Sequence, residues 1–295
     1  MIKGVLSIGF SDIIGTAISA IFWFFLATFI EPDEFGQIFY FLGIAGMVGY
    51  ISLIGTQDSI IVYVAKKVKI QSTFAILSLT AGGISSIIII MIFYRVDVSL
   101  IILGYIINTL ALGDLLGRKL YKSYSKYFLI QKILTLVLGL GFYYLFDVQG
   151  IIFELALSYI VYAVRVFKGF RETKIDFSLL KPRFGFIGNN YMMVLAQGSK
   201  TQMDKLIIGP LLGFSLLGNY ILALQIVAIM LMFTTIVFKY TLSQDASGNE
   251  NKKLKEISLL VSIGIAITAY LLSPIVIPEF FPKYSESIEA IQIMG

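Results

Sequence analysis

The chain is a succession of long apolar runs separated by short polar breaks. Residues 4–30 form the first run, and Asp12 is its one charged side chain. A helix needs about 20 mostly apolar residues to cross the hydrocarbon core of a bilayer. By that rule we predict nine membrane-spanning helices and the start of a tenth. The nine lie near residues 4–30, 36–64, 73–93, 98–117, 127–146, 150–167, 186–211, 214–240 and 257–277.

Composition supports a membrane protein over a soluble one. Of the 295 residues, 58% are hydrophobic and 14% are charged, and the mean hydropathy is +0.88. Soluble domains average about 45–50% apolar and about 25% charged residues. A net charge of +5 could favour nucleic acid, but that needs a basic face on a folded surface. Here the basic residues fall in short clusters between apolar runs, so we predict an all-α integral membrane protein without a nucleic-acid partner.

The residue types that are missing narrow the chemistry. The sequence has no cysteine and no histidine. Disulfides and thiolate metal sites are therefore excluded, and proton handling must use carboxylates. The phosphate-binding pattern of an ATP-driven pump is not met either, because "GFSLLG" is followed by Asn219 and Tyr220. We expect no metal, no cofactor and no enzymatic activity.

Basic residues are distributed unevenly between alternate loops. Seventeen lie at the N-terminus and in the loops after the second, fourth, sixth and eighth predicted spans, against two, Arg95 and Lys283, in the other loops. Cytoplasmic loops carry an excess of lysine and arginine. We therefore predict a multi-pass protein of the cytoplasmic membrane whose N-terminus is cytoplasmic.

An internal repeat is suggested by an offset of 182 residues. Setting Gly36 against Gly218 aligns "EFGQIFYFLGIA" with "LLGNYILALQIVA" and span 186–211 with residues 4–29. Six predicted spans separate the two starts, so both halves enter the membrane in the same direction. This predicts parallel repeats related by an axis along the membrane normal, a known transporter design. We expect a six-helix bundle at 1–184 and a partial second bundle at 185–295, two helices short, around a central cavity.

Three stretches resemble one known family. "FIEPDEFGQIFYFLGIAGMVGYISLIG" resembles the first turn and second helix of the polysaccharide and oligosaccharide-lipid flippases. "MDKLIIGPLLGFSLLGNYILALQI" resembles the start of their second half, and "FFPKYSESIEAIQIMG" the segment that leads into their tenth helix. The chain departs from the family in two ways. It lacks an arginine before the proline of the first turn, where Thr28, Phe29 and Ile30 stand, and it stops where the family continues.

The resemblance implies a member of the multidrug/oligosaccharidyl-lipid/polysaccharide exporter superfamily. Such a protein would flip lipid-linked oligosaccharide precursors from the cytoplasmic to the outer leaflet by alternating access. The implied partners are a glycan linked to a polyprenyl phosphate or pyrophosphate, membrane lipids and glycan-assembly enzymes. Two alternatives stay open: an ion-coupled multidrug exporter of the same superfamily, and a membrane-embedded glycan polymerase or ligase.

The most polar predicted span contains the stretch "AQGSKTQMDKLIIGPLLG". Residues seven apart lie on one side of a helix, and Asn190, Gln197 and Asp204 have that spacing. Ionisable groups in membrane helices cost roughly 2.5–3.5 kcal/mol each and usually face a bundle interior or a cavity. We predict substrate binding by this stripe together with Lys200, which can pair with Asp204, and Lys205. The alternative is a structural salt bridge between helices.

Other spans add candidates. Glu154, Ser158 and Arg165 share a face of span 150–167, and Lys132 lies about one turn inside span 127–146. We predict ion coupling at Asp204 or Glu154 and further substrate contacts at Arg165 and Lys132. For Arg165, Lys132, Asp114 and Asp12 the alternative is that their heads extend to the membrane surface. The aromatic candidates for sugar rings are Tyr40, Tyr159, Tyr162 and Tyr191.

Overall fold

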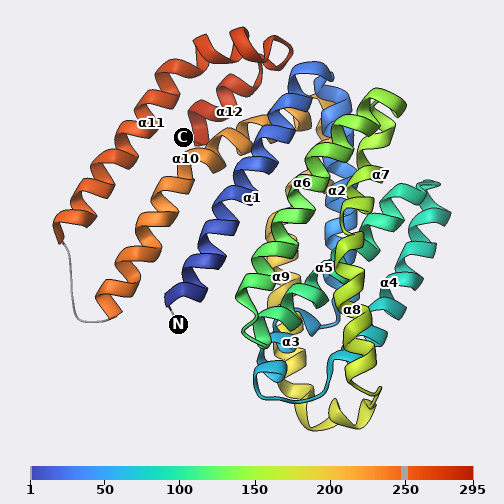
Figure 1. The fold of residues 1–295 in the computed structure, drawn as a ribbon. Helices are drawn as coiled ribbons and strands as arrows, with labels where there is room; N and C mark the ends of the chain where they lie inside the picture. The colour runs from blue at the N-terminus through green and yellow to red at the C-terminus, as the bar shows by residue number, and fades with distance from the viewer. Residues whose placement is uncertain (1, 247–251, 295) are drawn as a thin grey trace. The chain divides into compact units, whose positions relative to one another are not determined.

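The computed structural model describes residues 2–246 and 252–294, with side chains over 7–231, 256 and 259–294. Over these residues the chain is helical and contains no strand (Figure 1). The longer helices are α1 (Ile2–Phe29), α2 (Pro32–Leu53), α3 (Thr56–Ala65), α4 (Gln71–Phe93), α5 (Val96–Gly117), α6 (Tyr121–Phe146), α7 (Val148–Ser158), α8 (Ile160–Glu172), α9 (Phe184–Leu212), α10 (Phe214–Ala246), α11 (Lys252–Phe280) and α12 (Ser287–Met294). Short 3-10 turns lie at Phe177–Leu179, Lys181–Arg183 and Pro282–Tyr284.

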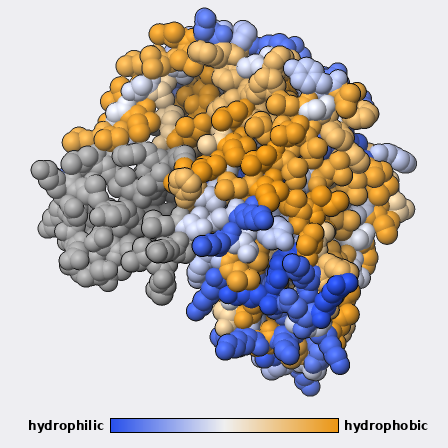
Figure 2. Space-filling view, in the orientation of Figure 1, coloured by the Kyte–Doolittle hydropathy of each residue, from blue (hydrophilic) through white to orange (hydrophobic). Residues whose placement is uncertain are grey.

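Eight segments of the described chain are long and apolar enough to cross a membrane. They are Ser7–Phe29, Pro32–Leu53, Gln71–Phe93, Val96–Gly117, Tyr121–Phe146, Val148–Glu172, Phe214–Leu231 and Leu259–Phe280. Large apolar side chains cover their outer faces, as on α4, where Ile87 is 60% exposed and Met91 70%; Figure 2 shows such residues over much of the visible surface. The prediction of an all-α, multi-pass membrane protein is confirmed.

Three predicted spans differ from the observed helices, and the one predicted at 150–167 is divided at Tyr159 into α7 and α8. The span predicted at 36–64 is wrong as one helix, because Ile54 (φ 47°) and Gly55 (φ 73°) separate α2 from α3. The segment predicted at 186–211 is helical as α9, but it is not among the eight apolar spans. Its amides and its charged residues Lys200, Asp204 and Lys205 make it more polar than the rest.

The helices group into two compact units. Unit 1 contains residues 1–23 and 40–207, and unit 2 contains residues 24–39 and 208–295. The core of unit 1 is built on α5, whose Ile101, Ile102 and Ile106 are fully buried. The core of unit 2 includes Ala223 and Ile277 with residues of α12. These units are not the halves predicted at 1–184 and 185–295, and that division into repeats stays a prediction.

Within unit 2, α2 and α10 touch at two glycines. A Cβ on Gly36 would lie 1.9 Å from the carbonyl oxygen of Phe214, and a Cβ on Gly218 would lie 2.0 Å from that of Pro32. Gly36 therefore faces the carbonyl of Phe214, four residues before Gly218, and Gly218 faces the carbonyl of Pro32, four residues before Gly36. Only a hydrogen in place of a side chain permits so close a backbone approach.

Candidate functional site

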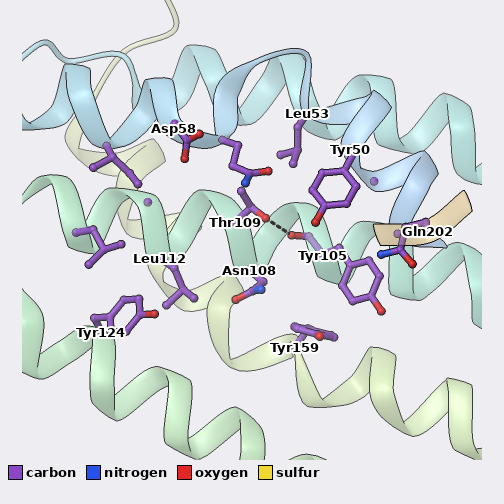
Figure 3. Close-up of a pocket in the computed structure, with 16 residues that line it drawn as sticks. Tyr50, Leu53, Asp58, Tyr105, Asn108, Thr109, Leu112, Tyr124, Tyr159 and Gln202 are labelled. Carbon is purple, nitrogen blue, oxygen red and sulfur yellow. Dashed lines mark hydrogen bonds between the residues drawn. The ribbon is translucent and has the colours of Figure 1, made fainter. Parts of the chain in front are cut away.

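A cavity of about 380 Å³ lies inside unit 1 (Figure 3). Helices α2, α3, α5, α6 and α9 and the junction of α7 with α8 line it. Its polar side chains are Tyr50, Gln57, Asp58, Tyr105, Asn108, Thr109, Tyr124, Tyr159 and Gln202. Ligand pockets generally measure about 300–1,000 Å³, so the space is large enough for a small ligand or for part of a larger one.

Helical spacing places the polar face of α5 on this cavity. Asn108 and Thr109 follow Tyr105 by three and four residues and precede Leu112 by four and three, and all four line it, as residues on one side of a helix do. Thr109 Oγ1 donates to the carbonyl of Tyr105 (2.9 Å). The opposite side of α5 carries the apolar core of unit 1, so the same helix supplies both a packed face and a polar wall.

Close glycines bring a neighbouring helix to the cavity wall. A Cβ on Gly46 of α2 would lie 2.8 Å from Gln202 Nε2 of α9. A Cβ on Gly198 of α9 would lie 2.7 Å from the Tyr50 ring. These contacts fix α9 against α2 and hold the amide of Gln202 at the cavity.

The lining is rich in phenols and amides. The rings of Tyr105 and Tyr159 meet edge to face, with their centroids 5.4 Å apart, and Figure 3 shows them with Tyr50 around one part of the cavity. Asn108 Oδ1 is buried and has no hydrogen-bond partner among the described residues. Asp58 is the one charged residue of the lining. The cavity therefore offers ring faces and hydrogen-bonding groups, with a single negative charge.

Asp114 follows Gly113, which lines this cavity, and is the centre of a buried ionic cluster. Arg165 forms an ion pair with Asp114, Arg118 Nε donates to it at 2.9 Å and Gln71 Nε2 at 3.2 Å. Arg118 also pairs with Glu172. Burial lowers the pKa of Arg118, but the bonds to Asp114 and Glu172 outweigh burial and raise it above its ordinary value.

The cluster corrects one sequence-based alternative. Asp114 is 4% exposed and Arg165 8%, so neither head extends to a membrane surface, because each finds its partner inside the protein. The role predicted for Arg165 in substrate binding stays a prediction. Lys132 is half-buried, with Nζ 5.5 Å from the centroid of the Phe128 ring.

Glu154 is fully buried with Ser158 on the predicted common face. Both carboxylate oxygens of Glu154 lack a hydrogen-bond partner among the described residues. A Cβ on Gly139 would lie 2.9 Å from Glu154 Oε1. Ser158, one turn further on, is bonded to Gln131 and Thr135. Such an unpartnered buried carboxyl is uncommon and makes Glu154 a good candidate for binding a proton.

The residues of the predicted polar stripe on α9 differ in their burial and in their contacts. Asn190 is buried and donates to the carbonyl of Gly55 (3.3 Å) and to Ser59 Oγ (3.2 Å), so it ties α9 to the break between α2 and α3. Lys205 Nζ lies 3.4 Å from Asp204 Oδ1. Gln197 and Lys200 are exposed. The predicted pair of Lys200 with Asp204 stays a prediction.

The cavity contains mostly residues that the sequence did not single out. Of the predicted aromatic candidates, Tyr159 lines it, whereas Tyr162 is fully buried in the core and the Tyr191 hydroxyl donates to the carbonyl of Ile51. Tyr40, the fourth candidate, is half-buried. The three- and four-residue spacing of polar side chains on α5 is the signal that could have predicted this site.

No family model, curated protein or solved structure matches the chain. Among the described residues, no group of histidine, cysteine, aspartate or glutamate is arranged to hold a metal ion. The functional assignment therefore depends on the cavity and the sequence.

Proposed function

We propose that this chain is a transporter that flips lipid-linked glycan precursors between the leaflets of a cytoplasmic membrane. The observation that carries the proposal is the tyrosine- and amide-lined cavity within a multi-pass helical protein. A polar cavity between membrane helices gives a hydrophilic head group a place to reside while its lipid tail stays in the bilayer. The sequence resemblance to oligosaccharide-lipid flippases supports the same function.

The chemistry of the lining suits sugars. Sugar rings have apolar faces that pack on aromatic rings and hydroxyls that bond to amides and phenols. Tyr105 and Tyr159 supply the first kind of surface, and Asn108 with its unpartnered oxygen supplies an acceptor. Lysine and arginine are absent from the described lining. We therefore assign the glycan to this cavity and expect the phosphate to bind elsewhere.

Parallel repeats are part of the proposal, and helix positions support them. Pro32, the first residue of α2, and Phe214, the first residue of α10, differ by 182, the offset of the sequence repeat. The first residues of α4 and α11, Gln71 and Lys252, differ by 181. Gly36 and Gly218, also 182 apart, make reciprocal contacts with Phe214 and Pro32. Equivalent residues that contact one another reciprocally are what a two-fold axis produces.

One observation favours a second candidate, a multidrug exporter. Asp58 is the charged residue of a lining that includes four tyrosines, and an organic cation is attracted both to a carboxylate and to aromatic faces. This candidate shares the architecture and differs in the cargo. The experiment must therefore separate the two cargoes.

The test is deletion of the gene in its host, followed by measurement of lipid-linked oligosaccharides. We expect a finished lipid-linked glycan to accumulate, and the chain to relieve the accumulation. A Tyr105→Ala/Tyr159→Ala variant should relieve it poorly, and Tyr94→Ala should match the wild type, because Tyr94 is exposed outside the cavity. Membrane levels of each variant are compared by immunoblot.

Two results would reject the flippase. One is an unchanged pool of lipid-linked glycans in a host without a second flippase. The other is full relief by the double tyrosine variant. Loss of resistance to cationic compounds, with glycan pools unchanged, would instead support the multidrug exporter.

A further inference from the structure

Two lysines occupy a backbone conformation that favours glycine. Lys67 follows α3 with φ 59°, and Lys119 follows α5 with φ 60°. Left-handed residues that end helices in this way are usually glycine, because a Cβ is disfavoured there. The two helix ends have the same pattern of hydrogen bonds, in which the lysine N–H and the N–H of the next residue donate to carbonyls of the helix. The four bonds, all 2.9 Å, run from Lys67 to Val64, Val68 to Tyr63, Lys119 to Leu116 and Leu120 to Leu115.

Both lysines line one pocket of unit 1. This pocket measures about 690 Å³ and lies at the end of the helices, apart from the tyrosine-lined cavity. Lys69 and Arg118 also line it, and Glu172 is its one acidic residue. Figure 2 shows hydrophilic residues gathered at the end of the unit that carries α3. Four basic groups thus surround one space with one carboxylate.

The carboxylate does not neutralise the lysines. Glu172 Oε2 lies 2.5 Å from Arg118 Nη2 and 3.6 Å from Arg165 Nη2. Lys67, Lys69 and Lys119 form no ion pair with any of the described residues. The pocket therefore holds three uncompensated positive charges, two of them on residues in a disfavoured backbone conformation.

We propose that this pocket binds a phosphate group, as a phospholipid head group or as a soluble phosphate. Lysine ammonium groups bind phosphate as point charges, and basic pockets between membrane helices bind anionic head groups. The backbone N–H groups of both turns are already bonded to helix carbonyls. The lysine side chains therefore carry the binding. The inference does not depend on the cargo of the tyrosine-lined cavity.

Glycine substitution separates charge from structure. Lys67→Gly/Lys119→Gly removes both charges and places the preferred residue at both turns, so the melting temperature should stay the same or rise. Tyr94→Gly is the matched control, because Tyr94 ends α4 with φ 54° and carries no charge. Lys67→Asn/Lys119→Asn is a second neutral pair, since asparagine also tolerates this conformation.

The purified full chain in neutral detergent is titrated with phosphatidylglycerol, followed by native mass spectrometry, and with inorganic pyrophosphate, followed by calorimetry. We expect the wild type and Tyr94→Gly to bind at least one probe equally. Both lysine double variants should bind it roughly 30-fold more weakly, a value that follows from the contribution of a basic residue near an anionic surface.

The pattern of binding identifies the source of the phosphate. Binding of phosphatidylglycerol alone identifies a lipid head group, and binding of pyrophosphate identifies a soluble phosphate. The proposal is overturned if the wild type binds neither probe, or if the lysine variants bind as tightly as the wild type. Neither result bears on the flippase assay, which measures glycan accumulation.

Discussion

At the scale of single residues, the buried ion pair of Arg165 with Asp114 makes a testable prediction about the stability of unit 1. Arg165→Gln leaves Asp114 buried with weaker compensation, and breaking a buried pair typically costs about 3–5 kcal/mol. We expect a lower melting temperature for the purified variant in detergent. Asp114→Asn/Arg165→Gln should recover part of the loss, because no uncompensated charge of this pair remains.

A full loss in the double variant, equal to the sum of the two single losses, would contradict this account. Additive losses are expected of residues that do not interact. Arg118 also bonds to Asp114, so the recovery should be partial.

Glu154 differs from this pair because its oxygens have no partner among the described residues. If the chain is the proposed transporter and Glu154 takes up its coupling proton, Glu154→Gln should retain the fold and lose the response of transport to a proton gradient. The measurement is substrate flipping by the reconstituted chain with and without an imposed gradient. Glu289→Gln, on an exposed residue, is the control. Flipping by Glu154→Gln that still follows the gradient would remove Glu154 from the coupling.

At the scale of helices, the reciprocal glycine contact between α2 and α10 makes a testable claim. Gly36→Ala and Gly218→Ala each place a Cβ within 2.0 Å of a carbonyl oxygen, so each should force the helices apart and lower the melting temperature by a similar amount. The double variant should lose little more, since residues that share one contact are not additive. Gly264→Ala, with nothing within 4 Å of the added Cβ, is the control.

Unequal single losses that add in the double variant would show that the two positions are not equivalent. That outcome would count against the proposed repeat. It would leave the contact itself unchanged, because each distance is independent of symmetry.

The sequence predicts helices better than it predicts their breaks or the site. Hydropathy depends on local composition, so it locates the spans within a few residues. The break at Gly55 depends on α9, because a Cβ there would lie 2.3 Å from the carbonyl of Ile187. The cavity likewise combines Tyr50, Tyr105 and Gln202 from three helices. The spacing of residues along one helix shows which of them share a face, but it does not show which helices pack together. Only the polar face of α5 could therefore have been predicted from the sequence.

At the scale of the whole molecule, the uneven distribution of basic residues predicts the orientation in the membrane. The loop before α6 contains Arg118 and Lys119, and Lys122 is exposed at the start of that helix. Tyr94, between α4 and α5, is 85% exposed. Cytoplasmic loops carry the excess of lysine and arginine, so Lys122 should face the cytoplasm and Tyr94 the outside.

Because the sequence contains no cysteine, single cysteines report this orientation without background. A membrane-impermeant maleimide added to intact cells should label Tyr94→Cys and should label Lys122→Cys only after the membrane is permeabilised. The reverse pattern would place the N-terminus outside, since four predicted spans precede Lys122 and return the chain to its starting side. The basic pocket, which contains Lys119, would then also lie outside and could not bind a phosphate group from the cytoplasm. The labelling therefore also shows which leaflet or compartment supplies the phosphate group.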